Sequence, residues 1–283
     1  MPDLYVVATP IGNLSDLSPR AIAILSECDF VIAEDTRHTL PLLTHFGIRK
    51  PLVSCHKFNE RDQVERIITR LQESGIAALV SDAGTPAISD PGYLLVAAAW
   101  NAGITVRGVA GPSAVVTALS VSGFNADRFT FYGFAPRAEK GRKALWQAMG
   151  SSGIPVAVLY ESPKRIVDLC TSLAAAVPQA LCCVCCDLTK RFEHSVRGTV
   201  TEVLQALTSN PNAALGEYVL VVALGEKAPA EGESPPLSLE AQLVDYMNAH
   251  ACSLKDAQVG LTALGMKKNA LYQAALHIKT MFA

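Results

Sequence analysis

Over residues 4–120, two patterns of apolar and polar positions follow one another in turn along the chain. Short apolar runs that end at Gly, Pro or Asn predict buried strands. Longer segments between them carry apolar residues three and four positions apart, which predicts amphipathic helices. The clearest helix spans 62–74, where Val64, Ile67 and Leu71 share one face. The expected strands are 4–8, 30–33, 52–55, 77–80 and 105–109, and the other expected helices are 19–27, 38–46, 91–101 and 114–120.

Strands and helices alternate in this half of the chain with short connections, so we expect a mainly parallel sheet covered by helices. After Gly123 strands follow one another more closely, which favours a second α/β domain with a mixed sheet. Its expected strands are 129–133, 156–160, 180–188, 194–198 and 218–224, with helices at 140–149, 165–176 and 200–207.

The last part of the chain differs in composition. Residues 226–236 are rich in Pro and Glu and predict a linker. Helices follow, and a turn containing Gly265 with lysines behind it is typical of a helix-turn-helix, while a small bundle used in dimerisation is an equal alternative. The predicted fold is α/β, with one α/β domain over 1–120, a second over 121–225, the linker over 226–236 and a helical tail over 237–283.

Charge and hydropathy exclude some classes of function for this chain. The chain carries 24 Lys and Arg against 26 Asp and Glu, a net charge of −2. This balance argues against a general nucleic-acid coat protein but allows local basic patches. The first residues show no charged region followed by an apolar one, and no apolar run reaches about 18 residues. We therefore expect no export signal, no membrane association and a cytoplasmic location.

Eight cysteines are present, four of them within Cys182–Cys186. No second pair or nearby His completes a zinc spacing, so we expect no metal. The run has the pattern of a buried strand, in which free Cys behaves as a small hydrophobe. Unpaired thiols also suit a reducing cytoplasm.

Several common motifs of α/β enzymes are missing. No two glycines are spaced i, i+2, so the dinucleotide fingerprint G-x-G-x-x-G is absent, and no Gly-Lys pair forms a phosphate-binding P-loop. Neither His-Glu-x-x-His nor Gly-x-Ser-x-Gly occurs. The chain is therefore not an ordinary dehydrogenase, nucleotide triphosphatase or serine hydrolase.

Polar segments follow each of the five strands expected in the first half. In a parallel sheet all of them meet at the carboxyl edge, where ligands bind in open α/β sheets. The segment 81–92 is the richest, with two Asp, two Gly and two Pro in twelve residues. The other four segments are 8–14, 33–37, 56–60 and 110–114.

These segments, with two from the second domain, resemble the tetrapyrrole-methylase family of S-adenosylmethionine-dependent methyltransferases. Within it they resemble the bacterial branch that methylates a ribose 2′-hydroxyl of a decoding-centre cytidine in 16S ribosomal RNA. The resemblance covers about residues 4–225. Ala110, Lys164 and Leu215 depart from the family pattern, and Leu215 stands where a Lys is frequent. The matching motifs are Thr9–Leu14, Glu34–Arg37, Asn59-Glu60, Ser81–Gly92, Tyr160–Arg165 and Leu188–Glu193.

The resemblance implies that S-adenosylmethionine binds in a cleft between the two α/β domains. It also implies a homodimer that acts on 16S rRNA in the small ribosomal subunit. Phe134 and Glu217 are the weaker cofactor contacts from the second domain. The cofactor contacts expected from the first domain are Pro10, Asp82, Ala83, Gly84, Ser113 and Ala114.

A ribose hydroxyl is a weak acid, so its methylation benefits from a general base or from a cation that stabilises the developing alkoxide. We hypothesise that Lys190 and Glu193 lower the barrier, while Arg37 and Asn59 position the RNA backbone. Further candidates for the catalytic group are Glu34, Asp35, Glu60 and Glu161.

RNA also requires positive charge around the cleft, although runs of charge are as often plain solvated surface. One alternative function is C-methylation of a tetrapyrrole precursor, whose carboxylates suit the same basic rim. Another is a catalytically inactive module that senses the cofactor or docks on ribosomes. The full set of expected RNA contacts is Arg37, Asn59, Glu60, Arg137, Arg142, Lys143, Lys164, Arg165, Arg191, Lys267 and Lys268.

Overall fold

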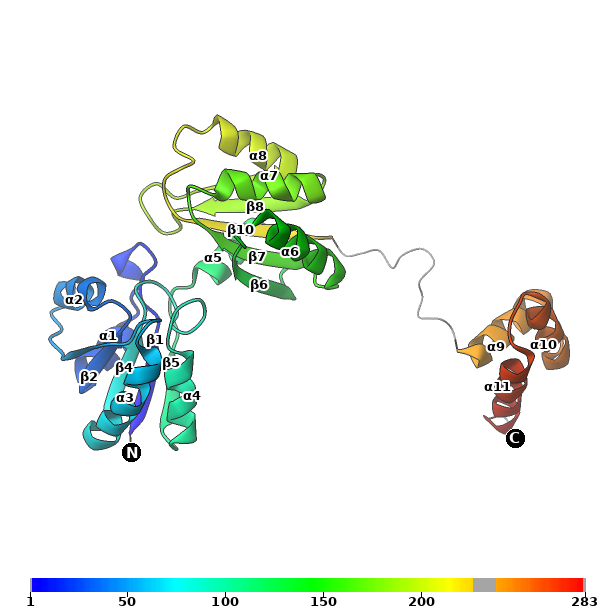
Figure 1. Ribbon diagram of the computed structural model, residues 1–283, viewed down its shortest axis with the longest axis horizontal. Helices are drawn as coiled ribbons and strands as arrows, with labels where there is room; N and C mark the ends of the chain where they lie inside the picture. Colours follow the sequence, from blue (N-terminus) through cyan, green and yellow to red (C-terminus); the bar gives the residue numbers. More distant parts are fainter. Residues whose placement is uncertain (1, 226–237, 282–283) are drawn as a thin grey trace. The chain divides into compact units, whose positions relative to one another are not determined.

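The computed structural model describes residues 2–225 and 238–281 (Figure 1). These residues divide into two compact units, one holding two five-stranded sheets and the other holding three helices. The predicted linker at 226–236 lies outside the described residues.

The first sheet is entirely parallel, as predicted, with strand order β3-β2-β4-β1-β5. Ser18 caps the first helix and Pro19 occupies its first turn. Two helices cover each face of this sheet, and each pair of helices packs against it in a separate apolar core. The strands are β1 (Asp3–Val7), β2 (Phe30–Ala33), β3 (Leu52–Ser54), β4 (Ile76–Val80) and β5 (Thr105–Val109). Helices α1 (Pro19–Glu27) and α2 (Thr36–His45) cover one face, and α3 (Glu60–Ser74) and α4 (Tyr93–Asn101) the other.

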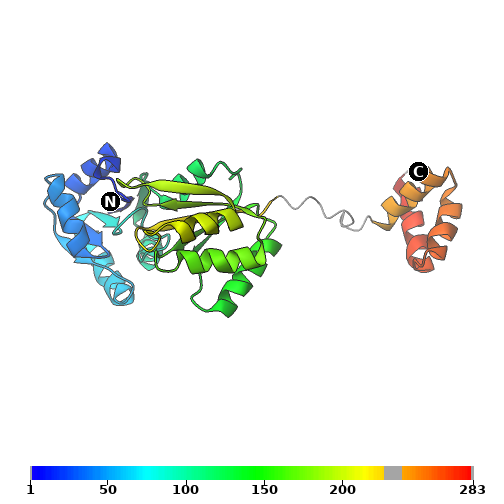
Figure 2. The same cartoon turned by 90° about the horizontal axis from the view of Figure 1, so that it is seen from above.

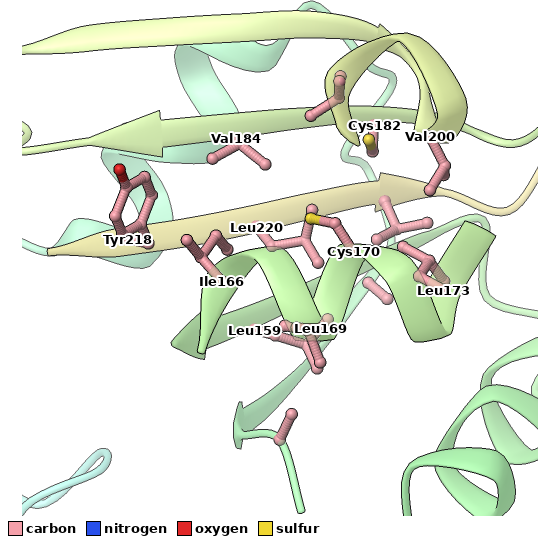
Figure 3. Close-up of a cluster of buried hydrophobic side chains, with 14 of the residues drawn as sticks. Leu159, Ile166, Leu169, Cys170, Leu173, Cys182, Val184, Val200, Tyr218 and Leu220 are labelled. Carbon is pink, nitrogen blue, oxygen red and sulfur yellow. The ribbon is translucent and has the colours of Figure 1, made fainter. Parts of the chain in front are cut away.

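The second sheet is mixed, as predicted, with strand order β6-β7-β10-β8-β9. Only the β6 and β7 pair is parallel, and the other three pairs are antiparallel. Figure 3 shows one apolar face, where Leu159 and Leu220 of the sheet meet Leu169 and Leu173 of a helix. The strands are β6 (Phe129–Phe134), β7 (Val156–Glu161), β8 (Leu181–Cys186), β9 (His194–Thr199) and β10 (Tyr218–Ala223). This face is covered by α6 (Glu139–Ser151), α7 (Ile166–Ala176) and α8 (Val200–Ser209).

Helix α5 (Ala114–Ser122) belongs with the second sheet and not with the first. Its buried residues Val115, Ala118 and Leu119 pack against the opposite face of the second sheet from α7. The expected domain boundary at residue 120 therefore moves to the segment before α5, after β5 ends at Val109. The apolar pattern of a helix identifies its buried face, but it does not say which sheet that face meets.

All five residues of Cys182–Cys186 are buried, and successive residues face opposite cores of the second sheet, Cys182 and Cys186 on one side and Cys183 and Cys185 on the other. All eight cysteines of the chain are free thiols. The prediction that this run is a buried strand is confirmed. Across the described residues, no helix is both long and apolar enough to span a lipid bilayer.

The tail contains α9 (Leu239–His250), α10 (Leu254–Ala263) and α11 (Lys268–Met281), which lie together in Figure 2. Their apolar side chains share one core. Ser253 and Asp256 form a capping box at the start of α10. Lys267 and Lys268 are exposed at the start of α11.

Glu60 is a structural residue at the junction of α3 and α4. It is buried, and one of its carboxylate oxygens accepts hydrogen bonds from the backbone N–H groups of Gly92, at 2.9 Å, and Leu94, at 3.1 Å. Gly92 precedes α4 with φ +127°, a conformation that favours glycine and leaves no side chain to cap the helix. The Glu60 carboxylate supplies that cap and favourable negative charge at the helix N-terminus.

We predict that Glu60→Ala lowers the free energy of unfolding by about 2 to 3 kcal/mol, because it leaves two backbone N–H groups without an acceptor. Urea denaturation followed by circular dichroism measures this loss. Glu65→Ala, at an exposed position of the same helix, is the control and should change the free energy by less than about 0.5 kcal/mol. A loss below about 1 kcal/mol for Glu60→Ala would contradict the capping role.

Candidate active site

Five loops leave the first sheet at one edge, because its five strands run in the same direction. Two of these loops are joined by backbone pairing. Thr9 N–H donates to the Gly84 carbonyl at 2.9 Å, and Gly84 N–H donates to the Thr9 carbonyl at 3.1 Å. The Thr9 hydroxyl adds a bond to the Ser81 carbonyl at 3.1 Å. Gly84 has φ +81°, so the glycine is required for this geometry.

A cavity of about 400 Å³ lies against this pairing and is lined by loops that follow strands of the first sheet and by strands of the second sheet. Ile11, Ile88 and Tyr160 give it apolar walls, while Asp90 and Glu161 contribute carboxylates. Its volume falls within the range of small-molecule and cofactor sites. Six of the eight residues predicted to contact a cofactor line it, namely Ala83, Gly84, Ser113, Ala114, Phe134 and Glu217. We call this the donor cavity.

The other two predicted cofactor contacts, Pro10 and Asp82, line a second cavity of about 380 Å³. The two cavities are neighbours, because adjacent residues of the same two loops line them: Pro10 and Gly12 face this one and Ile11 the donor cavity. His38 also lines the second cavity. We call it the acceptor cavity.

Asp82 ties the loop after β4 to the start of α2. One of its carboxylate oxygens accepts the Asp35 N–H at 3.1 Å, and the other lies 2.8 Å from Nδ1 of His38. The hydrogen bond and the negative charge of Asp82 raise the pKa of His38. No expectation from the sequence included His38, because its partner is 44 residues away in the chain.

Carboxylates concentrate at this edge of the sheet and disfavour one another's ionisation. Burial raises the pKa of Glu34, and the negative charges of Asp90 and Asp82 raise it further. Burial and then Asp82 likewise raise the pKa of Asp90, which lines the donor cavity. A cationic ligand at this edge would relieve the repulsion.

Asp35 and Glu161, two of the catalytic candidates, are committed to other partners. Asp35 caps α2 and pairs with the Arg37 guanidinium, which lowers the pKa of Asp35 well below its usual range and makes it a weak base. Glu161 is buried, accepts the Ser162 N–H at 2.8 Å and lies 3.0 Å from the Arg165 guanidinium. Both placements argue for structural roles.

Lys190 lies in the loop that joins β8 to β9. Its Nζ is 2.9 Å from a carboxylate oxygen of Glu217 and 3.3 Å from one of Asp187. Partial burial works to lower the pKa of Lys190, but the two carboxylates outweigh it and raise that pKa. Gly12 packs directly on the stem of Lys190, since a Cβ at Gly12 would overlap Cγ of the lysine. This packing brings Lys190 to a loop that lines the acceptor cavity.

The conformation of that loop is strained. Asp187 and Thr189 have φ of +51° and +67°, which is unusual for residues other than glycine and most of all for a β-branched one. The Glu193 carboxylate accepts the Thr189 N–H at 2.5 Å and so holds the turn in place. Strain of this kind concentrates at functional sites.

The structure separates the expected RNA contacts into engaged and available side chains. Glu60 is buried, Asn59 binds its own loop through His56 and Ser54, and Arg165 donates to the carbonyls of Ala135 and Pro136. These placements argue against Glu60, Asn59 and Arg165 as RNA contacts. Arg142 donates to the Arg137 carbonyl and Lys143 pairs with Glu139. The exposed basic residues of the set are Arg37, Arg137, Lys143, Lys164, Arg191, Lys267 and Lys268.

Two aromatic side chains that the sequence reasoning missed are exposed on loops of this region. Phe58 is 92% exposed and Phe192 is 73% exposed. Each follows a basic residue, Lys57 and Arg191 respectively, which is the combination that single-stranded nucleic acid favours. The sequence signal that could have identified Phe58 and Phe192 is an aromatic residue within a polar, basic loop.

Comparison with known proteins places the chain among methyltransferases. The family model for tetrapyrrole (corrin/porphyrin) methylases matches residues 3–204. A protein of Xylella fastidiosa named ribosomal RNA small subunit methyltransferase I is 41% identical over 270 residues, covering 95% of this chain and 97% of its own. A protein of the same name from Pseudomonas aeruginosa is 41% identical over 274 residues, covering 96% of this chain and 96% of its own. Another from Escherichia coli O157:H7 is 40% identical over 274 residues, covering 96% of this chain and 94% of its own.

Solved structures share the fold at low sequence identity. A diphthine synthase matches with a TM-score of 0.60 at 16% identity, covering 78% of this chain and 89% of its own. The uroporphyrin-III C-methyltransferase of Thermus thermophilus complexed with S-adenyl homocysteine matches with a TM-score of 0.52 at 14% identity, covering 78% and 97%. The fold, the family model and the relatives agree, and the chain belongs to the tetrapyrrole (corrin/porphyrin) methylase family.

Proposed function

We propose that this protein transfers a methyl group from S-adenosylmethionine to a ribose 2′-hydroxyl of 16S rRNA in the small ribosomal subunit, at a decoding-centre cytidine. The observation that carries the proposal is the similarity to small subunit rRNA methyltransferases along almost the whole of both chains. The pair of neighbouring cavities supports it, since one suits the methyl donor and the other an acceptor.

The donor cavity fits S-adenosylmethionine by its size and its chemistry. The apolar walls from Ile11, Ile88 and Phe134 suit the adenine ring and the thioether chain. Asp90 and Glu217 suit the cationic sulfonium and ammonium groups. When bound, the cofactor supplies an electrophilic methyl group on a good leaving group. The protein's main task is then to align the 2′-oxygen with the bond between that methyl group and sulfur.

Methylation of a tetrapyrrole is the weaker proposal. The family model bears that name, but the relatives at about 40% identity are named for small subunit rRNA. The solved structures named uroporphyrin-III C-methyltransferase, diphthine synthase and methyltransferase CobJ are less than 20% identical and support the fold only. A catalytically inactive module is weaker still, because both cavities and the strained loop are intact.

Lys190 is the group that we propose to stabilise negative charge as it develops on the 2′-oxygen. It is held on Gly12 beside the acceptor cavity and bonded to Glu217 of the donor cavity, so it lies where the two meet. Glu193 supports Lys190 by fixing the turn at Thr189. Glu193 is therefore a positioning residue in this proposal.

We also propose that the protein acts as a homodimer in the cytoplasm. Exposed apolar side chains on α4 and α5, such as Tyr93, Trp100 and Val116, offer surface for association. The eight free thiols suit a reducing compartment.

We expect methyl transfer from labelled S-adenosylmethionine to small-subunit particles, and none to uroporphyrinogen. Naked 16S RNA should be a weaker acceptor, because a chain with a net charge of −2 gains little from unspecific phosphate attraction. Mass spectrometry of nuclease fragments maps the product to a ribose 2′-oxygen. Labelling of the tetrapyrrole, or of no acceptor, would refute the proposed function.

We expect Lys190→Ala to lower the single-turnover rate on saturating particles by about 10²-fold to 10³-fold, because one positioned donor is worth about that much to a developing oxyanion. Cofactor affinity, measured by calorimetry, should change little. Glu193→Ala should show a smaller loss, and Lys50→Ala, ahead of β3 at the opposite edge of the first sheet, should retain the full rate. Near-normal rates for both Lys190→Ala and Glu193→Ala would exclude the role of this loop.

Arg142 and Lys143 of α6 line a groove together with residues of α7 such as Asp168 and Ala175. The salt dependence of binding tests whether this groove contacts RNA. Removing Arg142 and Lys143 together should reduce the slope of log K against log salt by roughly one for each phosphate group that the variant no longer neutralises. Filter binding to small-subunit particles over a range of salt measures the slope. Arg66→Ala on exposed α3 surface is the control. An unchanged slope would remove this groove from the RNA footprint.

A further inference from the structure

His38 and Asp82 form a histidine–carboxylate pair on the wall of the acceptor cavity. The 2.8 Å bond uses Nδ1 of the imidazole, which leaves Nε2 as the second ring nitrogen. The other Asp82 oxygen is held by the Asp35 N–H at 3.1 Å, so the carboxylate has a fixed orientation. His38 is 68% exposed and Asp82 34%, so the ring is accessible to a ligand.

The acceptor cavity has the composition of a nucleoside site. Leu14, Pro41 and Leu42 give it apolar surface, and its polar groups come from His38, His45 and Ser81. The hydroxyl of Thr39, which also lines it, is buried and has no hydrogen-bond partner among the described residues. Buried polar groups without a partner are rare in folded proteins, so this hydroxyl favours a polar ligand here.

We propose that His38 is the general base of the methyl transfer, with Asp82 holding its imidazole in the required tautomer. The proposal rests on the proposed function, because it assigns the proton acceptor for a ribose hydroxyl placed in the acceptor cavity. The arrangement is that of other histidine–carboxylate pairs, in which the acid orients the ring through Nδ1–H and stabilises the imidazolium that forms.

The methyl transfer needs no reactant besides the methyl donor, the ribose hydroxyl and His38. A lone pair of the 2′-oxygen forms the new bond to the methyl carbon as the bond from that carbon to sulfur breaks. The electron pair of the broken bond stays on sulfur, which becomes a neutral thioether. The hydroxyl proton passes to Nε2 of His38, and the resulting imidazolium is paired with the Asp82 carboxylate.

Three of the acids considered for catalysis are committed to other partners. Asp35 is paired with Arg37, Glu161 is buried against Arg165, and the Glu193 carboxylate binds a backbone N–H. The charges that face His38 are Asp82 from the loop after β4, and Asp35 and Arg37 from the start of its own helix. Their sum raises the pKa of His38, toward the working pH that suits a general base.

The expected consequence is a pH-dependent rate. Below the pKa of His38 its ring is protonated and cannot accept the hydroxyl proton, so the wild-type single-turnover rate should rise with pH through that pKa. His38→Gln should lower the plateau by about 10²-fold to 10⁴-fold and abolish this rise. Glutamine can still donate to Asp82, so the fold and the cofactor affinity should be kept. Asp82→Asn should move the rise to lower pH and reduce the plateau.

A matched control lies in the tail, where His277 pairs with Glu240 at 3.1 Å and is 63% exposed. His277→Gln removes a comparable pair and should leave both plateau and pH dependence unchanged. NMR titration of the free protein gives a readout without turnover. The His38 ring should show a pKa above about 6.5 and the Nδ1–H tautomer when neutral, and Asp82→Asn should lower that pKa.

The outcomes separate the two proposals. Wild-type transfer to a 2′-oxygen tests the proposed function, and its absence would overturn both. Given that transfer, a His38→Gln plateau within about threefold of wild type would overturn the general-base role, as would a raised KM with an unchanged plateau, which marks a phosphate contact. If the pKa of His38 is unchanged in the Asp82→Asn variant, the pair between His38 and Asp82 does not form in solution.

Discussion

The common direction of the first five strands is the constraint on which the rest of the site depends. Because β1 to β5 are all parallel, each following loop leaves at the same edge, and the polar motifs of the chain gather there. The backbone pairing of Thr9 with Gly84 then fixes two of those loops against each other. Neighbouring residues of the paired loops face two different cavities, so one junction shapes both the donor and the acceptor site.

Most of the fold was predictable because its elements follow local rules. Strand 105–109 and helix 19–27 match the expectations closely, since apolar periodicity depends on residues a few positions apart. Helix α5 was assigned to the wrong sheet for the converse reason. Its apolar residues fit either core, and only the three-dimensional packing of Val115 and Leu119 shows that it covers the second sheet.

The site was predictable as a location but not as a set of roles. The motifs after the strands draw attention to Glu60, Asp82 and Glu161, but they do not show which of these acids is buried or what each one binds. Glu60 caps α4, Glu161 holds Arg165, and Asp82 orients His38. Each of these partners except Arg165 is more than 30 residues away, so no local pattern could have assigned them.

Glu217 links the chemistry of the two cavities. Its carboxylate lines the donor cavity and also forms the 2.9 Å ion pair with Lys190, whose stem rests on Gly12 at the acceptor cavity. The Glu217 side chain is 73% exposed, so water screens its attraction for Lys190. The packing of the Lys190 stem on Gly12 and the less exposed Asp187 carboxylate therefore do more than Glu217 to keep the lysine beside the acceptor cavity. The strained turn from Asp187 to Thr189 keeps the lysine at that junction.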